Sequence, residues 1–422
     1  MPFVVTSVHA VEVLDSRGRP TLEVHVQLDV GAHARAGVPS GASTGSGEAV
    51  ELRDGDPHRY AGQGVSHAAA NVDGPIAQAI CGRRFADIAE LDAVLIEADG
   101  TAKKSVLGAN AIIGVSMAAA RAHAASLGEP LWHYLRPEGV AARLPVPHFN
   151  VVNGGAHARN ELDFQEFMLA PLGAGSIGKA VRGGAEVYAK LRVLIGERGL
   201  STGLGDEGGF APEIARPETV LRLLVQAIED AGYPVGQKGI MLALDPAASE
   251  FYASGEYTVA GERLSSGDLV AFYQQLAADF PIWSLEDGMA EDDDDGWRRL
   301  TTDLGERLQL VGDDNFVTDP RRIERAASEG IANSSLIKLN QIGSVSETIE
   351  ALAVCRKVGY GAMISHRSGE TDDSFIADLA VSSGCGQLKS GAPARGERVT
   401  KYNRLLTIAD AEPGLPFGLP ER

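Results

Sequence analysis

Cysteine is scarce in this chain of 422 residues, which contains only Cys81, Cys355 and Cys385. Their number is odd and their spacing is wide, so the sequence shows neither a disulfide framework nor the closely spaced ligands of a zinc site. We therefore expect free thiols, and we expect any metal to be held by other residue types.

Long apolar runs are also missing. The longest nearly apolar stretch, residues 108–120, is shorter than the roughly 20 residues that a membrane-spanning helix needs. The first residues lack the charged segment and apolar core of a secretory signal peptide. We expect no membrane span and predict a cytoplasmic protein, and a second role at the cell surface stays open.

Positive charge is in short supply, because 38 lysine and arginine residues stand against 57 aspartate and glutamate residues, for a net charge of −19. Nucleic acid is therefore a poor candidate partner, since binding its phosphates needs a basic face. A small anionic substrate is compatible with the sequence, because a few local cations or a bound metal can outweigh the overall field.

The composition is otherwise that of a globular protein, with 44% apolar and 23% charged residues. Two domains fit the length, because a (β/α)8 barrel uses about 250 residues by itself. The composition changes near Arg136-Pro-Glu-Gly139, and we place the boundary there, between residues 1–135 and residues 136–422.

The first part of the chain combines strands and helices. Residues 22–30 alternate between apolar and polar, which predicts a strand with one buried face, paired with residues 4–14 across a turn. Helices are predicted here at 66–80, 91–98 and 109–126, and in the second part of the chain at 217–231 and near 401–408. The glycine-rich segment 37–47 fits either a linker or a mobile lid that carries a hydroxyl ligand, and composition leaves both open.

In the second part, charged residues close a series of short apolar runs. The gaps between successive positions are 41, 27, 25, 28 and 23 residues. Each of the last four fits one strand, one helix and two loops, and the longer first gap contains a hairpin-like segment at 251–264. Polar residues at the carboxyl ends of parallel strands are typical of the active site of a TIM barrel. The predicted mouth residues are Asp245, Glu286, Asp313, Lys338, His366 and Lys389.

Lys338 stands alone in the apolar run 336–343. If this run is a strand, Leu336, Lys338 and Asn340 share one face. A buried lysine should have a lowered pKa, because burial disfavours the charged form. The simpler interpretation is a lysine at a strand end with its amine in water, but the neighbouring carboxylate positions favour the functional one.

A dozen motifs, spread in order from residue 15 to residue 395, make the chain resemble the enolase family. They are Asp15-Ser-Arg-Gly18, Pro39-Ser-Gly-Ala-Ser-Thr-Gly45, Lys104-Ser105, Leu107-Gly-Ala-Asn-Ala111, Asn153-Gly-Gly-Ala-His157, Gln165-Glu-Phe167, Gly205-Asp-Glu-Gly-Gly209, Ser284-Leu-Glu-Asp287, Gly312-Asp-Asp314, Lys338-Leu-Asn-Gln-Ile-Gly343, Ser365-His-Arg-Ser-Gly-Glu-Thr371 and Lys389-Ser-Gly-Ala-Pro-Ala-Arg395. One glycine-rich motif would be a weak signal, whereas a dozen in order are specific.

The resemblance implies an α/β fold with an atypical (β/α)8 TIM-like barrel and a smaller amino-terminal α+β domain. It implies the reversible dehydration of 2-phosphoglycerate to phosphoenolpyruvate, a step of glycolysis and gluconeogenesis. It further implies two Mg²⁺ ions in each active site, the second bound with substrate, and a homodimer or a larger homo-oligomer.

The resemblance also implies roles for individual residues. Lys338 is the expected base that removes the α-proton, and Lys389 faces the substrate carboxylate. Glu207 is expected to protonate the leaving hydroxyl with Glu166 as its partner, and His157 supports them. Two adjacent carboxylates share a proton and raise the pKa of one of them, which keeps an acid available at neutral pH.

Further residues are implied as ligands of substrate and metal. Asp245, Glu286 and Asp313 offer hard oxygen atoms of the kind Mg²⁺ prefers, and Ser43 of the glycine-rich segment is the expected ligand of the second ion. Arg367 suits two-pronged phosphate binding. The full expected set of substrate contacts is His157, Gln165, Glu166, His366, Arg367, Ser368 and Lys389.

Two other functions stay open at this point. One is a related metal-dependent acid-sugar dehydratase, and the other is a non-catalytic binding protein with the same fold. Arg367 and Ser368 argue against the first, because acid sugars carry no phosphate. The intact set of carboxylates and lysines argues against the second.

Overall fold

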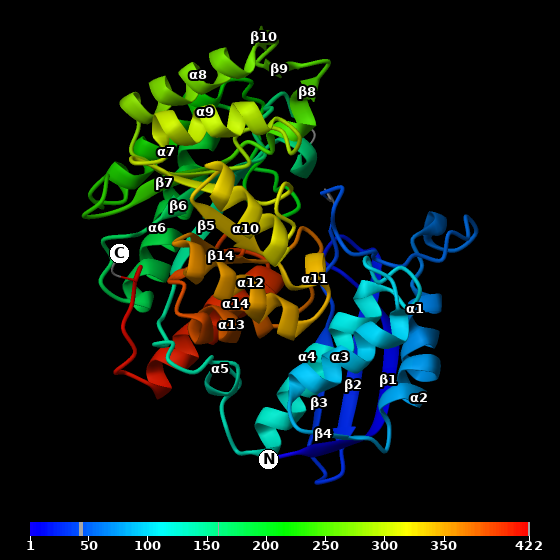
Figure 1. The fold of residues 1–422 in the computed structure, drawn as a ribbon. Coiled ribbons are helices and arrows are strands. Elements are labelled where there is room, and N and C mark those ends of the chain that lie inside the picture. Colours follow the sequence, from blue (N-terminus) through cyan, green and yellow to red (C-terminus); the bar gives the residue numbers. More distant parts are fainter. Residues whose placement is uncertain (42–44, 159, 421–422) are drawn as a thin grey trace.

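The computed structural model describes residues 1–41, 45–158 and 160–420. Ser43, the expected ligand of a second metal ion, lies outside the described residues. Figure 1 shows an amino-terminal sheet with helices beside a larger barrel, and the last helices pack on the barrel. The division after residue 135 stays a prediction.

The amino-terminal part contains an antiparallel four-stranded sheet in the order β3-β2-β1-β4. In β2, Leu22, Val24, Val26 and Leu28 are buried, so the alternation predicted for this strand is confirmed, as is its pairing with β1. The strands are β1 (Phe3–Leu14), β2 (Pro20–Leu28), β3 (His33–Gly37) and β4 (Arg84–Phe85).

The helix predicted over 66–80 is interrupted in the structure. Helices α1 (Ser66–Asn71) and α2 (Ala77–Ile80) are joined by a wider π turn at 72–76 that contains Pro75, which has no N–H to donate. The predicted bounds 66–80 are therefore confirmed, and the π turn in the middle is the feature that the sequence pattern did not indicate.

The other two amino-terminal helices follow the prediction more closely. Helix α3 (Ile88–Asp99) begins earlier than predicted, because the Asp87 side chain accepts the N–H of Glu90 and caps it. Helix α4 (Ala109–Ser126) has the predicted bounds. It is buried along most of its length, since it packs between the sheet and the barrel helices α11 and α12.

The barrel closes through eight strands in the order β11-β12-β13-β14-β15-β5-β6-β7. Strand β6 is antiparallel to both neighbours and the other adjacent strands run parallel, which confirms the predicted atypical barrel. The strands are β5 (Val146–Asn153), β6 (Glu166–Ala170), β7 (Met241–Asp245), β11 (Ile282–Glu286), β12 (Gln309–Gly312), β13 (Ser334–Ile337), β14 (Gly361–Ser365) and β15 (Gln387–Lys389).

An apolar layer inside the barrel supports the mouth. Val311, Leu336 and Met363 form a small buried cluster on neighbouring strands. Deeper in the barrel, the amides of Gln309 and Gln387 exchange two hydrogen bonds of 2.8 Å each. The polar residues beyond the strand ends therefore lie above buried, packed side chains of the barrel interior.

Helices surround the barrel. The predicted helix 217–231 is confirmed as α7, whereas the final helix, predicted for 401–408, begins earlier, at Gly396. The segment 251–264 forms a small three-stranded sheet of β8 (Tyr252–Ala253), β9 (Glu256–Val259) and β10 (Glu262–Leu264). The helices are α5 (Leu131–Tyr134), α6 (Ile177–Glu197), α7 (Pro217–Asp230), α8 (Ser266–Asp279), α9 (Asp294–Leu304), α10 (Pro320–Glu329), α11 (Leu339–Ile342), α12 (Val345–Val358), α13 (Phe375–Ser383) and α14 (Gly396–Ala411).

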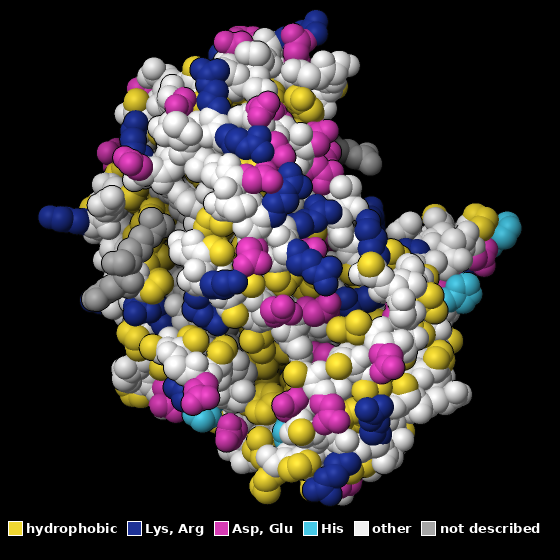
Figure 2. Space-filling model, in the orientation of Figure 1, with side chains coloured by type: hydrophobic (Ala, Val, Ile, Leu, Met, Phe, Trp, Pro, Cys, Tyr) yellow, Lys and Arg dark blue, Asp and Glu magenta, His cyan; other side chains and the backbone are white. Residues whose placement is uncertain are grey.

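The surface and the thiols agree with the composition. All three cysteines are free. Figure 2 shows acidic and basic side chains interspersed on one face. The ion pairs of the molecule include Arg325 with Asp294 and Arg298 with Glu329. Within the described ranges, every helix is too short or too polar to cross a bilayer.

Candidate active site

Titratable side chains at the ends of five barrel strands meet at the barrel mouth. Asp245, Glu286 and Lys389 are the last residues of β7, β11 and β15, and Asp313 and His366 directly follow β12 and β14. All five are buried. Parallel strands bring their carboxyl ends to one rim, so the strand-end pattern in the sequence placed these residues together correctly.

Lys338 also lies at this rim, but it follows the end of a strand instead of lying within one. Strand β13 ends at Ile337, and the Lys338 N–H donates to the Thr318 hydroxyl instead of to a neighbouring strand. Residues 339–342 then form a single helical turn that ends at Gly343. The interpretation of the run 336–343 as one strand was therefore wrong.

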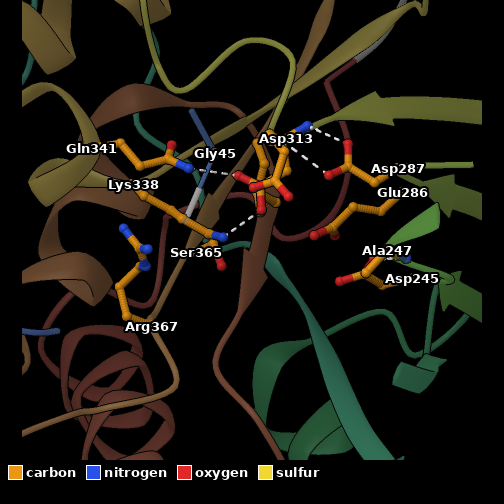
Figure 3. Close-up of polar contacts among 12 residues, drawn as sticks. Gly45, Asp245, Ala247, Glu286, Asp287, Asp313, Lys338, Gln341, Ser365 and Arg367 are labelled. Atoms are coloured by element: carbon orange, nitrogen blue, oxygen red, sulfur yellow. Dashed lines mark hydrogen bonds and ion pairs between the residues drawn. The ribbon is translucent and has the colours of Figure 1, made fainter. Parts of the chain in front are cut away.

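Asp313 is held by two donors (Figure 3). The Lys338 amine donates to Asp313 Oδ2 at 2.5 Å, and the Gln341 amide donates to Oδ1 at 2.8 Å. Burial alone would raise the pKa of Asp313, but the Lys338 charge lowers it. Burial has the largest single effect on Lys338 and would lower its pKa, but the carboxylates around it, Asp313 foremost and then Glu286, together raise the pKa above its ordinary value. The predicted fall of the Lys338 pKa is wrong for this arrangement.

Lys389 connects three carboxylates. Its amine lies 2.7 Å from Glu286 Oε1, 3.1 Å from Asp245 Oδ2 and 3.1 Å from Glu166 Oε1. Burial opposes its charge, but these carboxylates together raise its pKa well above the ordinary value. The amide of Gln165 also donates to Asp245 Oδ2 at 3.4 Å. Lys389 is therefore a fixed cation among buried anions.

Glu166, Glu207 and His157 form an acidic cluster beside Lys389. His157 Nδ1 lies 3.9 Å from Glu166 Oε1 and 3.8 Å from Glu207 Oε1. Burial and the Glu207 charge raise the pKa of Glu166 well above its ordinary value. Burial would also raise the pKa of Glu207, but His366, His157 and Arg398 lower it well below. The two carboxyl groups thus favour one proton between them, but this structure favours Glu166 as its holder, whereas the prediction made Glu207 the acid.

His366 is a neutral neighbour of Glu207. Arg398 Nη1 donates to His366 Nδ1, and a guanidinium can only donate, so the imidazole proton is on Nε2. That atom lies 3.2 Å from Glu207 Oε2. Burial, the largest cause, lowers the pKa of His366 to about 3. Asn150 donates to Glu207 Oε2 at 2.9 Å and so orients this carboxylate, whereas His366 Nε2 lies near it without a hydrogen bond.

Arg367 forms a two-pronged ion pair with Glu48. Its two terminal nitrogens donate to the Glu48 oxygens at 2.9 and 3.1 Å, and one of them also donates to Asn340 Oδ1 at 2.9 Å. Glu48 follows the glycine-rich segment in sequence, and its Oε1 accepts the N–H of Gly45. Glu48 thereby connects the glycine-rich segment to Arg367, the side chain expected to bind phosphate.

Arg398 organises the loop that contains His366, Arg367 and Ser368. Its fully buried side chain donates to the carbonyl oxygens of Arg367 and Ser368 at 2.6 Å each, and to that of Asp206 at 3.2 Å. Arg398 was not predicted from the sequence. The last helix was expected to begin near residue 401, whereas α14 begins at Gly396 and includes Arg398. Asn150, Glu48 and Gln341 were missed as well, and they lie outside any strand-end pattern.

Replacing Arg398 with methionine should loosen this loop. Three buried carbonyls and His366 would lose a charged donor, so we expect the free energy of unfolding to fall by about 3 kcal/mol, measured in urea, and the KM for substrate to rise. Arg404→Met is the matched control, because Arg404 pairs with Asp378 away from the mouth. Unchanged stability and KM in Arg398→Met would contradict the organising role.

One small cavity opens among these side chains. Ser365 lines it together with ten residues predicted from sequence, which are His157, Gln165, Glu166, Glu207, Asp245, Lys338, His366, Arg367, Ser368 and Lys389. Glu286 Oε2 is buried and has no hydrogen-bond partner among the described residues. With Asp245 and Asp313 it offers hard oxygen atoms of the kind that a divalent cation prefers, although the amines of Lys389 and Lys338 contact these carboxylates in this structure. Among the described residues, the groups whose ligand atoms already lie within 4.8 Å of one another are His157, Glu166 and Glu207, and Asp287, Asp313 and Asp314.

Comparison with known proteins identifies the family. The amino-terminal part, residues 5–135, matches the family model "Enolase, N-terminal domain", and residues 141–413 match "Enolase, C-terminal TIM barrel domain". The chain is 54% identical over 409 residues to the enolase of Rubrobacter xylanophilus, covering 96% of this chain and 95% of that protein. It is 53% identical over 407 residues to the enolase of Acidothermus cellulolyticus, covering 96% and 94%. The chain therefore belongs to the enolase family.

Proposed function

We propose that the enolase reaction of this chain, the dehydration of 2-phosphoglycerate to phosphoenolpyruvate in glycolysis, takes place in the cavity at the barrel mouth. The observation that carries this proposal is that Lys338, Lys389, Glu207 and Arg367 all line that one cavity. A base, a cation for the substrate carboxylate, an acid and a phosphate-binding group are thus available to one small molecule.

Membership of the enolase family implies dependence on Mg²⁺. We assign one ion to Asp245, Glu286 and Asp313, whose buried oxygen atoms fit such a cation. A second ion, bound with substrate and held in part by Ser43, stays a prediction. Bound Mg²⁺ would act as a Lewis acid on the substrate carboxylate and withdraw the charge that develops there.

Lys338 is the proposed base. Its ammonium donates to Asp313 in this structure, which holds it in place but also keeps it protonated. Burial favours the neutral amine, so Lys338 becomes basic when the Asp313 charge is no longer available to it. Lys389 stays charged among its carboxylates, and we assign it to orient the substrate carboxylate beside Lys338.

Glu207 is the proposed acid at the other carbon. With Glu166 and His157 it forms a cluster that favours a single proton. Glu166 is favoured as the holder of that proton in this structure, so the assignment of Glu207 as the group that delivers it to the leaving hydroxyl rests on the resemblance to enolases. The amide of Asn150 orients this carboxylate, and His366 Nε2 lies 3.2 Å from it. Gln165 and His157 are assigned as substrate contacts at this end.

Arg367 and Ser368 are assigned to the phosphate group. The ion pair with Glu48 and the contact with Asn340 fix the Arg367 guanidinium before substrate arrives. A phosphate site distinguishes this reaction from the dehydration of acid sugars. The homodimer or larger assembly and the cytoplasmic location stay predictions.

The purified protein should convert 2-phosphoglycerate in the presence of Mg²⁺, seen as growth of phosphoenolpyruvate absorbance. A chelator should abolish the reaction because three buried carboxylates then lack their cation, and added Mg²⁺ should restore it. D-Glycerate, which lacks the phosphate, should react at least about a thousandfold more slowly, since Arg367 has no partner on it. Undiminished turnover after chelation would contradict the metal assignment, and preferred turnover of an acid sugar would contradict the substrate.

A further inference from the structure

Asp287 joins the loops that follow two barrel strands. It is the first residue after β11, directly beyond Glu286, and its carboxylate is buried. One carboxylate oxygen accepts the N–H of Asp313 at 2.8 Å, and the other accepts the N–H of Asp314 at 3.0 Å (Figure 3). The side chain thus holds the backbone from which Asp313 projects.

The backbone of Asp287 makes two further connections. Its N–H donates to the Val311 carbonyl in β12 at 2.9 Å, and its carbonyl accepts the N–H of Ala248 at 3.0 Å. Ala248 belongs to the loop after β7, where Asp245 accepts the N–H of Ala247 at 3.0 Å. The three loops that follow Asp245, Glu286 and Asp313 therefore meet at this one residue.

The residue type suits this place. Asp287 has φ +42°, in the left-handed region that few side chains other than those of asparagine and aspartate adopt readily. Its short carboxylate reaches two consecutive N–H groups at once. It is not among the residues that line the substrate cavity, so its effect must pass through the groups that it holds.

We propose that Asp287 is a positioning residue that sets the mutual placement of Asp245, Glu286 and Asp313 and thereby the Mg²⁺ affinity of the mouth. This inference rests on the proposed function. Mg²⁺ demands near-ideal octahedral geometry with short bonds, so a small displacement of one carboxylate weakens the site. Groups that orient metal ligands typically contribute a factor of about 10–100 to metal affinity.

The test measures Mg²⁺ binding to the substrate-free protein by titration calorimetry. In Asp287→Ala, both N–H groups lose their acceptor, and we expect the Kd for Mg²⁺ to rise about 10–100-fold. Asp287→Asn keeps the shape but points an amide toward one of the two N–H groups, so its Kd should lie between those of parent and alanine variant. The Mg²⁺ concentration for half-maximal kcat should rise in the same order.

Asp54 provides the matched control. Its two carboxylate oxygens also accept consecutive backbone N–H groups, from Ser66 at 3.0 Å and His67 at 2.9 Å, in the amino-terminal sheet domain. Asp54→Ala should lose stability and keep the parent Kd for Mg²⁺. Circular dichroism establishes that each variant is folded, and the isosteric Asp287→Asn carries the test if the alanine variant unfolds.

Two outcomes would overturn the inference. One is a parent-like Kd in a folded Asp287 variant, and the other is an equal rise in Asp54→Ala, which would make the effect one of stability alone. A parent protein that binds no Mg²⁺ or leaves 2-phosphoglycerate unchanged would instead overturn the proposed function, so the two failures can be distinguished.

Discussion

Replacing Lys338 with alanine should stop the exchange of the α-proton of 2-phosphoglycerate with solvent deuterium. Lys338 is the lysine that projects from the end of β13 into the cavity and whose burial favours a neutral amine once Asp313 is engaged elsewhere. Loss of a general base lowers turnover by about 10²–10⁴-fold. Proton NMR of the substrate in deuterated buffer measures the exchange directly.

Lys104→Ala is the control for this experiment. Lys104 is buried and ion-paired with Glu347 at 3.0 Å, so its loss removes a comparable interaction away from the cavity. The folded fraction of that variant should exchange the α-proton like the parent. If Lys338→Ala exchanged as fast as the parent, the base would be misplaced and Lys389 would become the next candidate.

Glu207→Gln should separate the two halves of the reaction. Glutamine has the shape of glutamate but transfers no proton to the leaving oxygen, so formation of phosphoenolpyruvate should fall by about 10²–10⁴-fold. Exchange of the α-proton should persist, because Lys338 is unchanged. The elimination is then stepwise, with a charged intermediate held long enough by the cations of the mouth to be reprotonated.

Glu166→Gln is the informative companion variant. Glu166 contacts Lys389 and lies near His157 in the acidic cluster, and it is assigned as the partner of Glu207 and as a substrate contact. We expect it to slow product formation less than Glu207→Gln does. If Glu207→Gln bound substrate normally and yet failed to exchange the α-proton, the separate acid role of Glu207 would be wrong.

Much of the site could be predicted because it follows a local pattern. Asp245, Glu286 and Lys389 each close a short apolar run, and parallel strands carry such ends to one rim. The direction of β6 could not be read in this way, since an apolar run looks the same whichever way its strand runs. The resemblance to enolases, rather than the pattern, pointed to an atypical barrel.

The missed residues act across long sequence separations. Glu48 pairs with Arg367 and Arg398 donates to His366, and each partner lies on a different element. Asp287 was visible only as the neighbour of Glu286, because its partners at 313 and 314 are brought to it by the barrel. Such contacts depend on tertiary structure and leave no periodic signal in the sequence.

The reversed strand β6 also matters for engineering this scaffold. Glu166 starts β6 opposite Asp245, the end of β7, so Ala170 and the connection 171–176 lie at the far end of the barrel. No residue of that connection lines the substrate cavity, whereas residues that follow or end the parallel strands do. A tag or a fusion partner placed there would be displayed on the side away from catalysis, whereas altering the preceding connection, 154–165, would disturb His157 and Gln165.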